Sequence, residues 1–190
     1  MLHRPLLHPL FHVVLHEPEI PNNTGNIGRT CVATGSSLHL VHPLGFDTSE
    51  KACRRAGLDY WPRLDVREHA SWDEYLDRAR PPRLWMLTTA ATRSLFDVQL
   101  QRGDHLIFGK ETAGLPRSLL ASHPDQLICL PMMPGERSLN LATAACTVIY
   151  EGVRQLLHRR ELRLTPEGRI AETDPQLGDV RGGYPPNHNH

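Results

Sequence analysis

The second half of the chain takes its fold from the stretch Met132-Met133-Pro134-Gly135-Glu136-Arg137-Ser138-Leu139-Asn140-Leu141-Ala142-Thr143-Ala144-Ala145. This stretch leaves the apolar run 127–130 through a Pro/Gly loop and turns directly into a long helical pattern. Ser138 stands where a helix N-cap residue is expected, and Asn140 follows in the first turn. A helix N-terminus presents unpaired N–H groups and a positive dipole end, so the junction suits a polar ligand. An ordinary capped helix would show the same pattern.

Two further junctions have the same form. The apolar run 11–15 is followed by Asn22-Asn23-Thr24-Gly25-Asn26-Ile27-Gly28-Arg29-Thr30, and the run 104–107 is followed by Phe108-Gly109-Lys110-Glu111-Thr112-Ala113-Gly114-Leu115-Pro116. In open α/β sheets, ligands bind at the carboxyl ends of the strands. Three polar, glycine-rich strand ends in one small chain therefore indicate a shared site.

Apolar runs alternate with helical patterns, which predicts an α/β fold with a mostly parallel sheet covered by helices on both faces. The expected strands are residues 11–15, 38–42, 84–88, 105–108 and 126–130. The expected helices are residues 21–35, 48–56, 71–80, 116–121 and 138–159. Ser71 and Glu74 form a capping-box pattern, Pro116 suits a first helical position, and Gly35 suits the residue after a helix.

The length and charge of the chain indicate how many domains it has and how it could contact a nucleic acid. The chain has 190 residues, which favours one domain, and Lys+Arg and Asp+Glu are equal at 21 each. Because the formal net charge is zero, a nucleic acid would have to be contacted through a local patch. We expect an N-terminal extension at residues 1–10, one domain at 11–160 and a disordered tail at 161–190, which is rich in Pro and Gly.

Several other classes are disfavoured by the sequence. The cysteines at positions 31, 53, 129 and 146 include no C-x-x-C pair, and the histidines gather near the chain ends without ligand spacing, so no metal site is expected. No apolar run reaches the roughly 18 residues of a membrane span. The chain lacks both the dinucleotide-binding and the P-loop glycine motifs. Scattered cysteines of this kind fit reduced thiols in a cytoplasmic protein.

In this order, the three junctions resemble the signature motifs of the SPOUT superfamily of RNA methyltransferases, in its SpoU branch. Motif one corresponds to residues 23–29, motif two to residues 108–116 and motif three to residues 130–143. Within that branch, residues 17–26 and 54–61 resemble the enzymes that methylate the wobble position of tRNA. The similarity spans residues 11–155, so the two ends of the chain fall outside it.

The resemblance implies a fold, a cofactor and a reaction. It implies a deep C-terminal trefoil knot, S-adenosylmethionine (SAM) as cofactor, a homodimer, and 2′-O-methylation of the wobble nucleotide (cytidine or uridine 34) in the anticodon stem-loop of tRNA. The implied cofactor-binding residues are Leu87, Thr88, Gly109, Glu111, Leu130, Met132, Ser138 and Leu139. Gly109 is expected to let the cofactor approach the backbone closely. Methylation of another tRNA or rRNA position and a catalytically silent RNA-binding module stay open as alternatives.

The implied catalytic residues are Arg29, Asn23, Ser138 and Asn140. Arg29 matches the family's catalytic arginine, but a guanidinium keeps its proton in proteins and is a poor base. Its fixed fork of donors suits orientation of a phosphate and stabilisation of a developing alkoxide. Asn23, Ser138 and Asn140 are interpreted as positioning groups.

RNA contacts are expected from two places. One is the basic cluster Lys51, Arg54 and Arg55, and the other is the face of the last helix that carries Tyr150 and Arg154. Basic side chains hold phosphates, while an aromatic ring can stack on a splayed base. An ordinary solvated helix face is the alternative reading of each.

Overall fold

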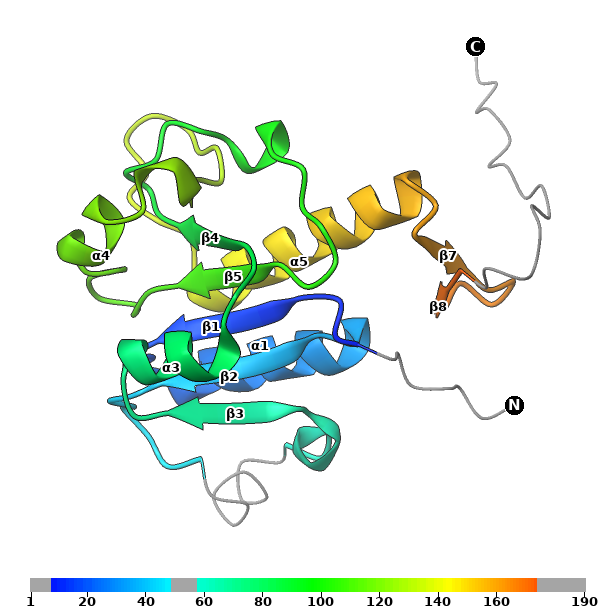
Figure 1. The fold of residues 1–190 in the computed structure, drawn as a ribbon, viewed down its shortest axis with the longest axis horizontal. Coiled ribbons are helices and arrows are strands. Elements are labelled where there is room, and N and C mark those ends of the chain that lie inside the picture. The colour runs from blue at the N-terminus through cyan, green and yellow to red at the C-terminus, as the bar shows by residue number, and fades with distance from the viewer. Residues whose placement is uncertain (1–7, 49–57, 174–190) are drawn as a thin grey trace.

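The five predicted apolar runs and one further edge strand form a six-stranded sheet in the order β3-β2-β1-β5-β4-β6, and every neighbouring pair in it is parallel. We describe it from a computed structural model that covers residues 8–48 and 58–173 (Figure 1). The strands are β1 His12–His16, β2 Ser37–Val41, β3 Val66–His69, β4 Leu84–Leu87, β5 His105–Phe108 and β6 Leu127–Ile128. The predicted parallel α/β sheet is therefore confirmed.

Helices cover both faces of the sheet, as predicted. They are α1 Pro21–Thr34, α3 Trp72–Ala79, α4 Arg117–Ala121 and α5 Leu141–His158. Alternate residues of β1 point to opposite faces, so Val13 and Leu15 join the core under α1 and α5, while Val14 joins the core under α3 and α4. Figure 1 shows α3 on the near side of the sheet and α1 and α5 behind it. The helix expected at residues 48–56 falls almost wholly outside the described residues.

The helix ends confirm some capping predictions and correct others. Gly35 follows α1 in the left-handed conformation at φ 69°, and Ser71 accepts a hydrogen bond from the Glu74 amide at the start of α3, both as predicted. Pro116 is the N-cap of α4 rather than its first helical residue.

The most consequential correction concerns α5. The helix begins at Leu141 and its N-cap is Asn140, whose Oδ1 accepts hydrogen bonds from two backbone amides of the first turn, at 2.9 and 3.2 Å. The prediction that Ser138 caps this helix is wrong. An asparagine carbonyl two residues nearer the helix satisfies the unpaired N–H groups, so Ser138 stays in the exposed loop.

Two regular segments escaped the sequence analysis. The edge strand β3 carries one aliphatic residue, Val66, followed by three polar ones, so it shows no apolar alternation. β7 Leu162–Leu164 and β8 Ile170–Glu172 form a separate antiparallel hairpin at the end of α5. Buried Leu162 and the 2.8 Å ion pair between Arg102 and Glu172 attach this hairpin to the domain.

The expected domain limits need correction at both ends. Because β7 and β8 are regular and attached, the prediction of a disordered tail from residue 161 is wrong for residues 162–172. Leu10 is fully buried, and its amide donates to the Gly35 carbonyl, so the packed domain begins inside the expected N-terminal extension.

The segment at β6 lies between β4 and the loop that follows β4. On one side the Thr88 amide donates to the Ile128 carbonyl at 3.0 Å. On the other side the Leu95 amide donates to the Cys129 carbonyl at 2.8 Å, and the Cys129 amide donates to the Arg93 carbonyl at 2.9 Å. The last part of the sheet is thus enclosed by a loop that precedes it in sequence.

A layer of buried histidines lies between the sheet and α3. A chain of side-chain hydrogen bonds joins His12 to His39 and His39 to His69, each at 3.0 Å, and Tyr75 contacts His105 at 2.6 Å. Burial lowers the pKa of His39 to about 2 and that of His105 to about 3, so these rings are neutral in the fold. Across residues 8–48 and 58–173, no three His, Cys, Asp or Glu side chains are arranged to hold a metal ion.

Candidate active site

The carboxyl ends of β4 and β5 open into a cavity of about 830 Å³. Its walls come from the residues after β4, from motif two after β5, from the start of α1, and from the segment that joins β6 to α5. The predicted residues that line it are Asn23, Leu87, Thr88, Gly109, Glu111, Leu130, Met132, Ser138, Leu139 and Asn140. The fold therefore brings together all the predicted cofactor residues and three of the four predicted catalytic residues.

Gly109 is needed for a reason that the sequence alone does not show, while the expected close approach of the cofactor stays a prediction. A Cβ built on Gly109 would lie 2.1 Å from the backbone carbon of Gly114 and 2.2 Å from the backbone nitrogen of Leu115. The Gly114 amide donates to the Lys110 carbonyl at 2.8 Å, and Gly114 itself adopts φ 68°. Motif two thus folds back on itself, and the close approach at Gly109 is made by its own loop.

The Glu111 carboxylate joins motif two to the start of α1. It accepts hydrogen bonds from the Glu19 amide at 2.9 Å, from the Ile20 amide at 3.2 Å and from Asn23 Nδ2 at 2.9 Å. Ile20 is the N-cap residue of α1 and has no capping side chain, so a carboxylate from motif two supplies the negative charge at this helix end. Although Glu111 lines the cavity, its three hydrogen bonds go to Asn23 of motif one and to the amides of Glu19 and Ile20 just before α1.

Asn23 and Asn140 extend this connection to motif three. Asn140 Nδ2 donates to Asn23 Oδ1 at 3.0 Å, and the Asn23 amide is buried with 6% exposure. The orientation of both amides is determined by their outer partners, because backbone N–H groups of α5 require the Asn140 oxygen and the Glu111 carboxylate requires the Asn23 nitrogen. The three motifs are therefore joined by one continuous hydrogen-bonded chain at the wall of the cavity.

Two further contacts clamp motif two against the segment before α1. Glu19 accepts from the amide and the hydroxyl of Thr112, both at 3.0 Å. Lys110 Nζ donates to Glu17 at 2.9 Å, and this hydrogen bond raises the pKa of the lysine. Glu17 and Glu19 thus hold motif two at the edge of the cavity. The sequence analysis gave these two carboxylates no role beyond their part in the resemblance.

Arg29 is the predicted catalytic residue that does not line the cavity. It lies on the exposed face of α1, where its guanidinium stacks on the Tyr60 ring at 4.5 Å from the ring centroid. The arginine side chain is 61% exposed. In one chain, therefore, the predicted catalytic arginine does not face the cavity.

The sequence matches the SpoU rRNA Methylase family over residues 10–150. The chain belongs to the SpoU methylase family. A tRNA (cytidine(34)-2′-O)-methyltransferase of Saccharophagus degradans is 48% identical over 148 residues, which cover 77% of this chain and 96% of that protein. A solved structure described by the 2-OH methylation of C/U34 on tRNA is 43% identical, with a TM-score of 0.73, and the match covers 78% of this chain and 97% of that one.

A third relative of this SpoU methylase bears on the cavity. The SpoU methyltransferase AviRb from Streptomyces viridochromogenes, solved in complex with its cofactor AdoMet, is 27% identical with a TM-score of 0.69. That match covers 81% of this chain and 63% of AviRb. In the present chain, Leu87, Leu130 and Leu139 give the cavity apolar walls beside polar loops, and its volume lies in the range of small-molecule sites.

Some predicted RNA-binding residues of this SpoU methylase lie away from the cavity. Lys51, Arg54 and Arg55 are outside the described residues. Tyr150 and Arg154 are exposed on α5 but do not line the cavity, and Arg154 makes two 2.8 Å hydrogen bonds to Glu151. Their role in binding RNA stays a prediction.

Two arginines at the cavity were missed by the sequence analysis. Arg117 and Arg137 both line it and are exposed. Each lies next to a motif, Arg117 directly after motif two and Arg137 within motif three. Their position in the sequence could have identified them, because a residue inside or directly after a site-forming loop lies close to that site.

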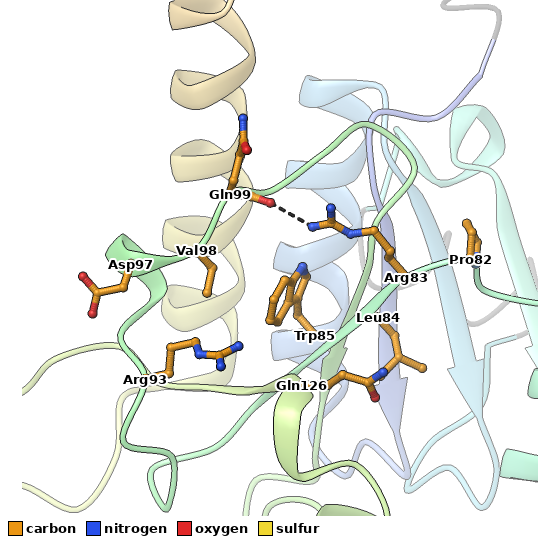
Figure 2. A pocket seen from close by; sticks show the side chains of 9 residues that line it. All are labelled: Pro82, Arg83, Leu84, Trp85, Arg93, Asp97, Val98, Gln99 and Gln126. Atoms are coloured by element: carbon orange, nitrogen blue, oxygen red, sulfur yellow. Dashed lines mark hydrogen bonds between the residues drawn. The ribbon is translucent and has the colours of Figure 1, made fainter.

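A second cavity, of about 480 Å³, lies at the amino end of β4 (Figure 2). Its arginines already have partners in the fold. Arg83 pairs with Asp104 at 3.0 Å and donates to the Gln99 carbonyl at 2.8 Å, while Arg93 donates to the Asp125 carbonyl at 2.9 Å. None of the predicted site residues lines this cavity. The cavity at the carboxyl ends of the strands is therefore the candidate active site of this SpoU methylase.

Proposed function

We propose that this protein is a SAM-dependent tRNA 2′-O-ribose methyltransferase that acts on the wobble nucleotide, cytidine or uridine 34. The observation that carries the proposal is the hydrogen-bonded chain Asn140–Asn23–Glu111, which joins the three motifs at one cavity. The family membership and the functions of two relatives, at 48% and 43% identity, support this reaction over the alternatives.

SAM would be held between the loops after β4, β5 and β6. Leu87, Leu130 and Leu139 supply apolar surface suited to a planar base, and the polar loops of motifs two and three surround the rest of the cavity. When bound, SAM supplies the methyl group on an electrophilic sulfonium. The protein then has to position the ribose hydroxyl and stabilise the charge that develops on it.

We assign to Arg29 the stabilisation of the charge that develops on the ribose hydroxyl. A guanidinium presents up to five donors in a rigid plane and stays protonated, so it can hold an RNA phosphate and stabilise an alkoxide but does not remove the proton. Ser138, which lines the cavity and is exposed, would help to position the substrate. Asn23 and Asn140 would act indirectly, by holding the cavity wall in place. Their side-chain amides are already hydrogen-bonded to each other, to Glu111 and to the first turn of α5.

The separation of Arg29 from the cavity supports a homodimer. We propose that Arg29 of one chain serves the cavity of a second copy, through an interface that includes the starts of α1 and α5. Ile20 and Leu139, which directly precede or cap the starts of these helices and line the cavity, are each 45% exposed. Exposed apolar groups that cluster beside a site are typical of an interaction surface.

The knot implied by the resemblance also remains a proposal. It is supported by the position of β6, which lies between β4 and the loop containing Arg93 and Leu95. The Gln155 side chain of α5 holds the same loop, accepting from the Leu100 amide at 2.8 Å and donating to the Val98 carbonyl at 3.0 Å. A chain that passes through an enclosing loop before it forms α5 has the connectivity that a trefoil knot requires.

The RNA would be contacted at the rim of the cavity. Arg117 and Arg137 offer exposed positive charge there, while the predicted contacts Lys51, Arg54 and Arg55 lie outside the described residues. Local charge of this kind suits a chain with no net charge, since phosphate contacts position RNA without a uniformly basic surface. No helix in the described ranges is long and apolar enough to span a membrane. We propose a cytoplasmic location, because tRNA is the proposed substrate.

The proposal is tested with tritiated SAM and unmodified tRNA transcripts. We expect methyl transfer to a transcript with cytidine or uridine at position 34 and none to the matched transcript that carries a 2′-deoxynucleotide there. The control differs by one oxygen atom, so it separates the target hydroxyl from every other methylation site. Equal transfer to both transcripts would contradict the proposed position, and transfer to neither would contradict the proposed reaction on tRNA.

A further inference from the structure

The turn that follows residue 58 packs directly on the exposed half of α1. Tyr60 is 2% exposed and precedes the short 3₁₀ turn Trp61–Arg63. A Cβ built on Gly28 would lie 2.9 Å from Leu64 Cδ2 and 3.3 Å from Trp61 Cζ3. The helix therefore needs a small residue at Gly28 so that this turn can approach it closely.

Tyr60 is held at one end and contacts Arg29 with its face. Its hydroxyl donates a hydrogen bond to the Gly25 carbonyl of α1. Its ring carries the Arg29 guanidinium, whose central carbon lies 4.5 Å from the ring centroid. Because Gly25 and Arg29 are one turn apart on the same helix, the tyrosine spans the helical turn from which the arginine projects.

Arg29 has weak support from charged groups. Among the residues that the structure describes, its ion-pair partner is Asp59, at 3.7 Å from Nη2, and the two side chains are 61% and 80% exposed. Exposed pairs of this kind contribute little, and ordering a free arginine side chain costs rotamer entropy. The stack on Tyr60 is therefore the contact that limits where the guanidinium can lie.

We propose that Tyr60 is a positioning residue for Arg29, an inference that rests on the proposed function. Stacking uses the face of the guanidinium and leaves the N–H groups in its plane available for oxygen acceptors. The Asp59 carboxylate lies 3.7 Å from Nη2, beyond hydrogen-bond distance, so it does not occupy those donors. Tyr60 thus holds the arginine in place while keeping its donors available for the phosphate or the ribose oxygen.

The test compares three variants of the full chain. Tyr60→Leu removes the ring, Tyr60→Phe removes only the hydrogen bond to Gly25, and Tyr75→Phe is the matched control, because Tyr75 is also a fully buried tyrosine whose hydroxyl has a partner, His105, under α3. We would measure the single-turnover rate of methyl transfer to tRNA and the Kd of SAM for each. The Arg29 Nε–Hε NMR resonance, assigned with Arg29→Lys, reports the stack directly through the ring current.

We expect Tyr60→Leu to lower the single-turnover rate about tenfold and Tyr60→Phe to lower it about threefold or less, with SAM Kd unchanged. Tyr75→Phe should keep the rate. A merely structural role would instead lower the SAM affinity and the free energy of unfolding of Tyr60→Leu together with its rate, whereas a positioning role lowers the rate alone. If Tyr60→Leu fails to fold, Tyr60→Met replaces it, since methionine fills the space without an aromatic face.

The outcomes separate this inference from the proposed function. A wild-type rate in Tyr60→Leu, with Arg29→Ala inactive, would overturn the positioning role and leave the function intact. No methyl transfer by the wild-type protein would overturn the function. An Arg29 resonance that does not move when the Tyr60 ring is removed would overturn the positioning role whatever the activity.

Discussion

Asn140 Nδ2 donates a hydrogen bond to Asn23 Oδ1 at 3.0 Å, which joins two residues 117 positions apart in the chain. Asn140 also caps α5, and Asn23 also binds Glu111, so this single contact lies between the two helices and the loop that surround the cavity. A shift of either helix end would break it. The cavity wall and the packing of α1 against α5 are therefore coupled through two amide side chains.

The first prediction concerns Asn140→Asp. Aspartate keeps the helix cap but replaces the donor with a second oxygen, which faces Asn23 Oδ1. If the Asn23 amide turns around, its oxygen then faces the Glu111 carboxylate, so one repulsive contact remains in either orientation. We expect SAM affinity and methyl transfer each to fall about tenfold or more, measured by calorimetry and a tritiated-methyl assay. Asn140→Ser, a weaker change at the cap, is the control, and equal activity in Asn140→Asp and wild type would contradict the coupling.

Glu111→Gln tests the carboxylate that serves three donors. A glutamine offers one carbonyl oxygen and an N–H₂ group, so at least one of the donors from Glu19, Ile20 and Asn23 is left without an acceptor. We expect the free energy of unfolding in urea to fall by about 1–3 kcal/mol. Glu136→Gln makes the same charge change in the exposed loop of motif three and should leave stability within about 0.5 kcal/mol of wild type. An equal loss of unfolding free energy in the two variants would show that stability depends on the negative charge and not on the three hydrogen bonds of Glu111.

The histidine layer predicts acid sensitivity. Burial lowers the pKa of His12, His39, His69 and His105 in the fold, while an unfolded chain titrates near the ordinary value of 6.5. The unfolded state therefore binds more protons below pH 6.5, so the free energy of unfolding is greatest above that pH and falls as the pH drops toward about 3. His39 and His105 should each contribute up to about 1.4 kcal/mol per pH unit in that window.

Urea unfolding between pH 7.5 and 5 measures this slope. His39→Gln should flatten it, because one of the neutral rings is removed from the layer, even if the variant is less stable at pH 7.5. His158→Gln, an exposed position in the last turn of α5, should leave the slope unchanged. A free energy of unfolding that is constant from pH 7.5 to 5 would contradict this prediction, because it would mean that protonation of the histidine layer does not destabilise the fold.

Arg29→Ala should abolish methyl transfer while SAM Kd stays close to normal, because Arg29 does not line the cavity. Loss of a donor that acts on developing charge costs about a hundredfold or more in rate. Arg29→Lys should not restore activity, since an ammonium lacks the planar fork. Loss of SAM binding together with activity would make Arg29 a cofactor or folding residue.

Mixed dimers test which chain supplies the arginine. Arg29→Ala and Ser138→Ala are each expected to be inactive alone. If Arg29 serves the cavity of the partner chain, a dimer with one copy of each variant contains one site with both residues intact, and mixing with subunit exchange should restore part of the activity. A mixture as inactive as either variant, with heterodimer formation shown by mass spectrometry, would place both residues in the site of one chain.

The sequence motifs predicted the lining of the cavity well because each junction follows a strand, and parallel strands bring their carboxyl ends to one edge. What they could not predict were contacts between junctions. The Asn140 cap replaced the Ser138 cap because the asparagine also bonds to Asn23, a partner that is distant in sequence. Gly109 proved to face the Gly114–Leu115 backbone, which is visible only once motif two has folded back.

Segments without periodicity escaped prediction for a related reason. β3 is recognisable as a strand only through its pairing with β2, where Leu38 lies beside Val66, and its own side chains are mostly polar. The hairpin β7–β8 depends on buried Leu162 and on the Arg102–Glu172 ion pair, whose partners are far apart in the chain. The stack of Arg29 on Tyr60 likewise needed the position of the turn on α1.

The most direct test of the central claim is a map of methylated riboses in total tRNA from cells with and without this protein. The account predicts that 2′-O-methylation disappears at nucleotide 34 of a subset of tRNAs when the protein is absent. It also predicts that the mark returns with the wild-type gene but not with Arg29→Ala. A map that is unchanged at nucleotide 34, or changed only at other tRNA positions or in rRNA, would contradict it.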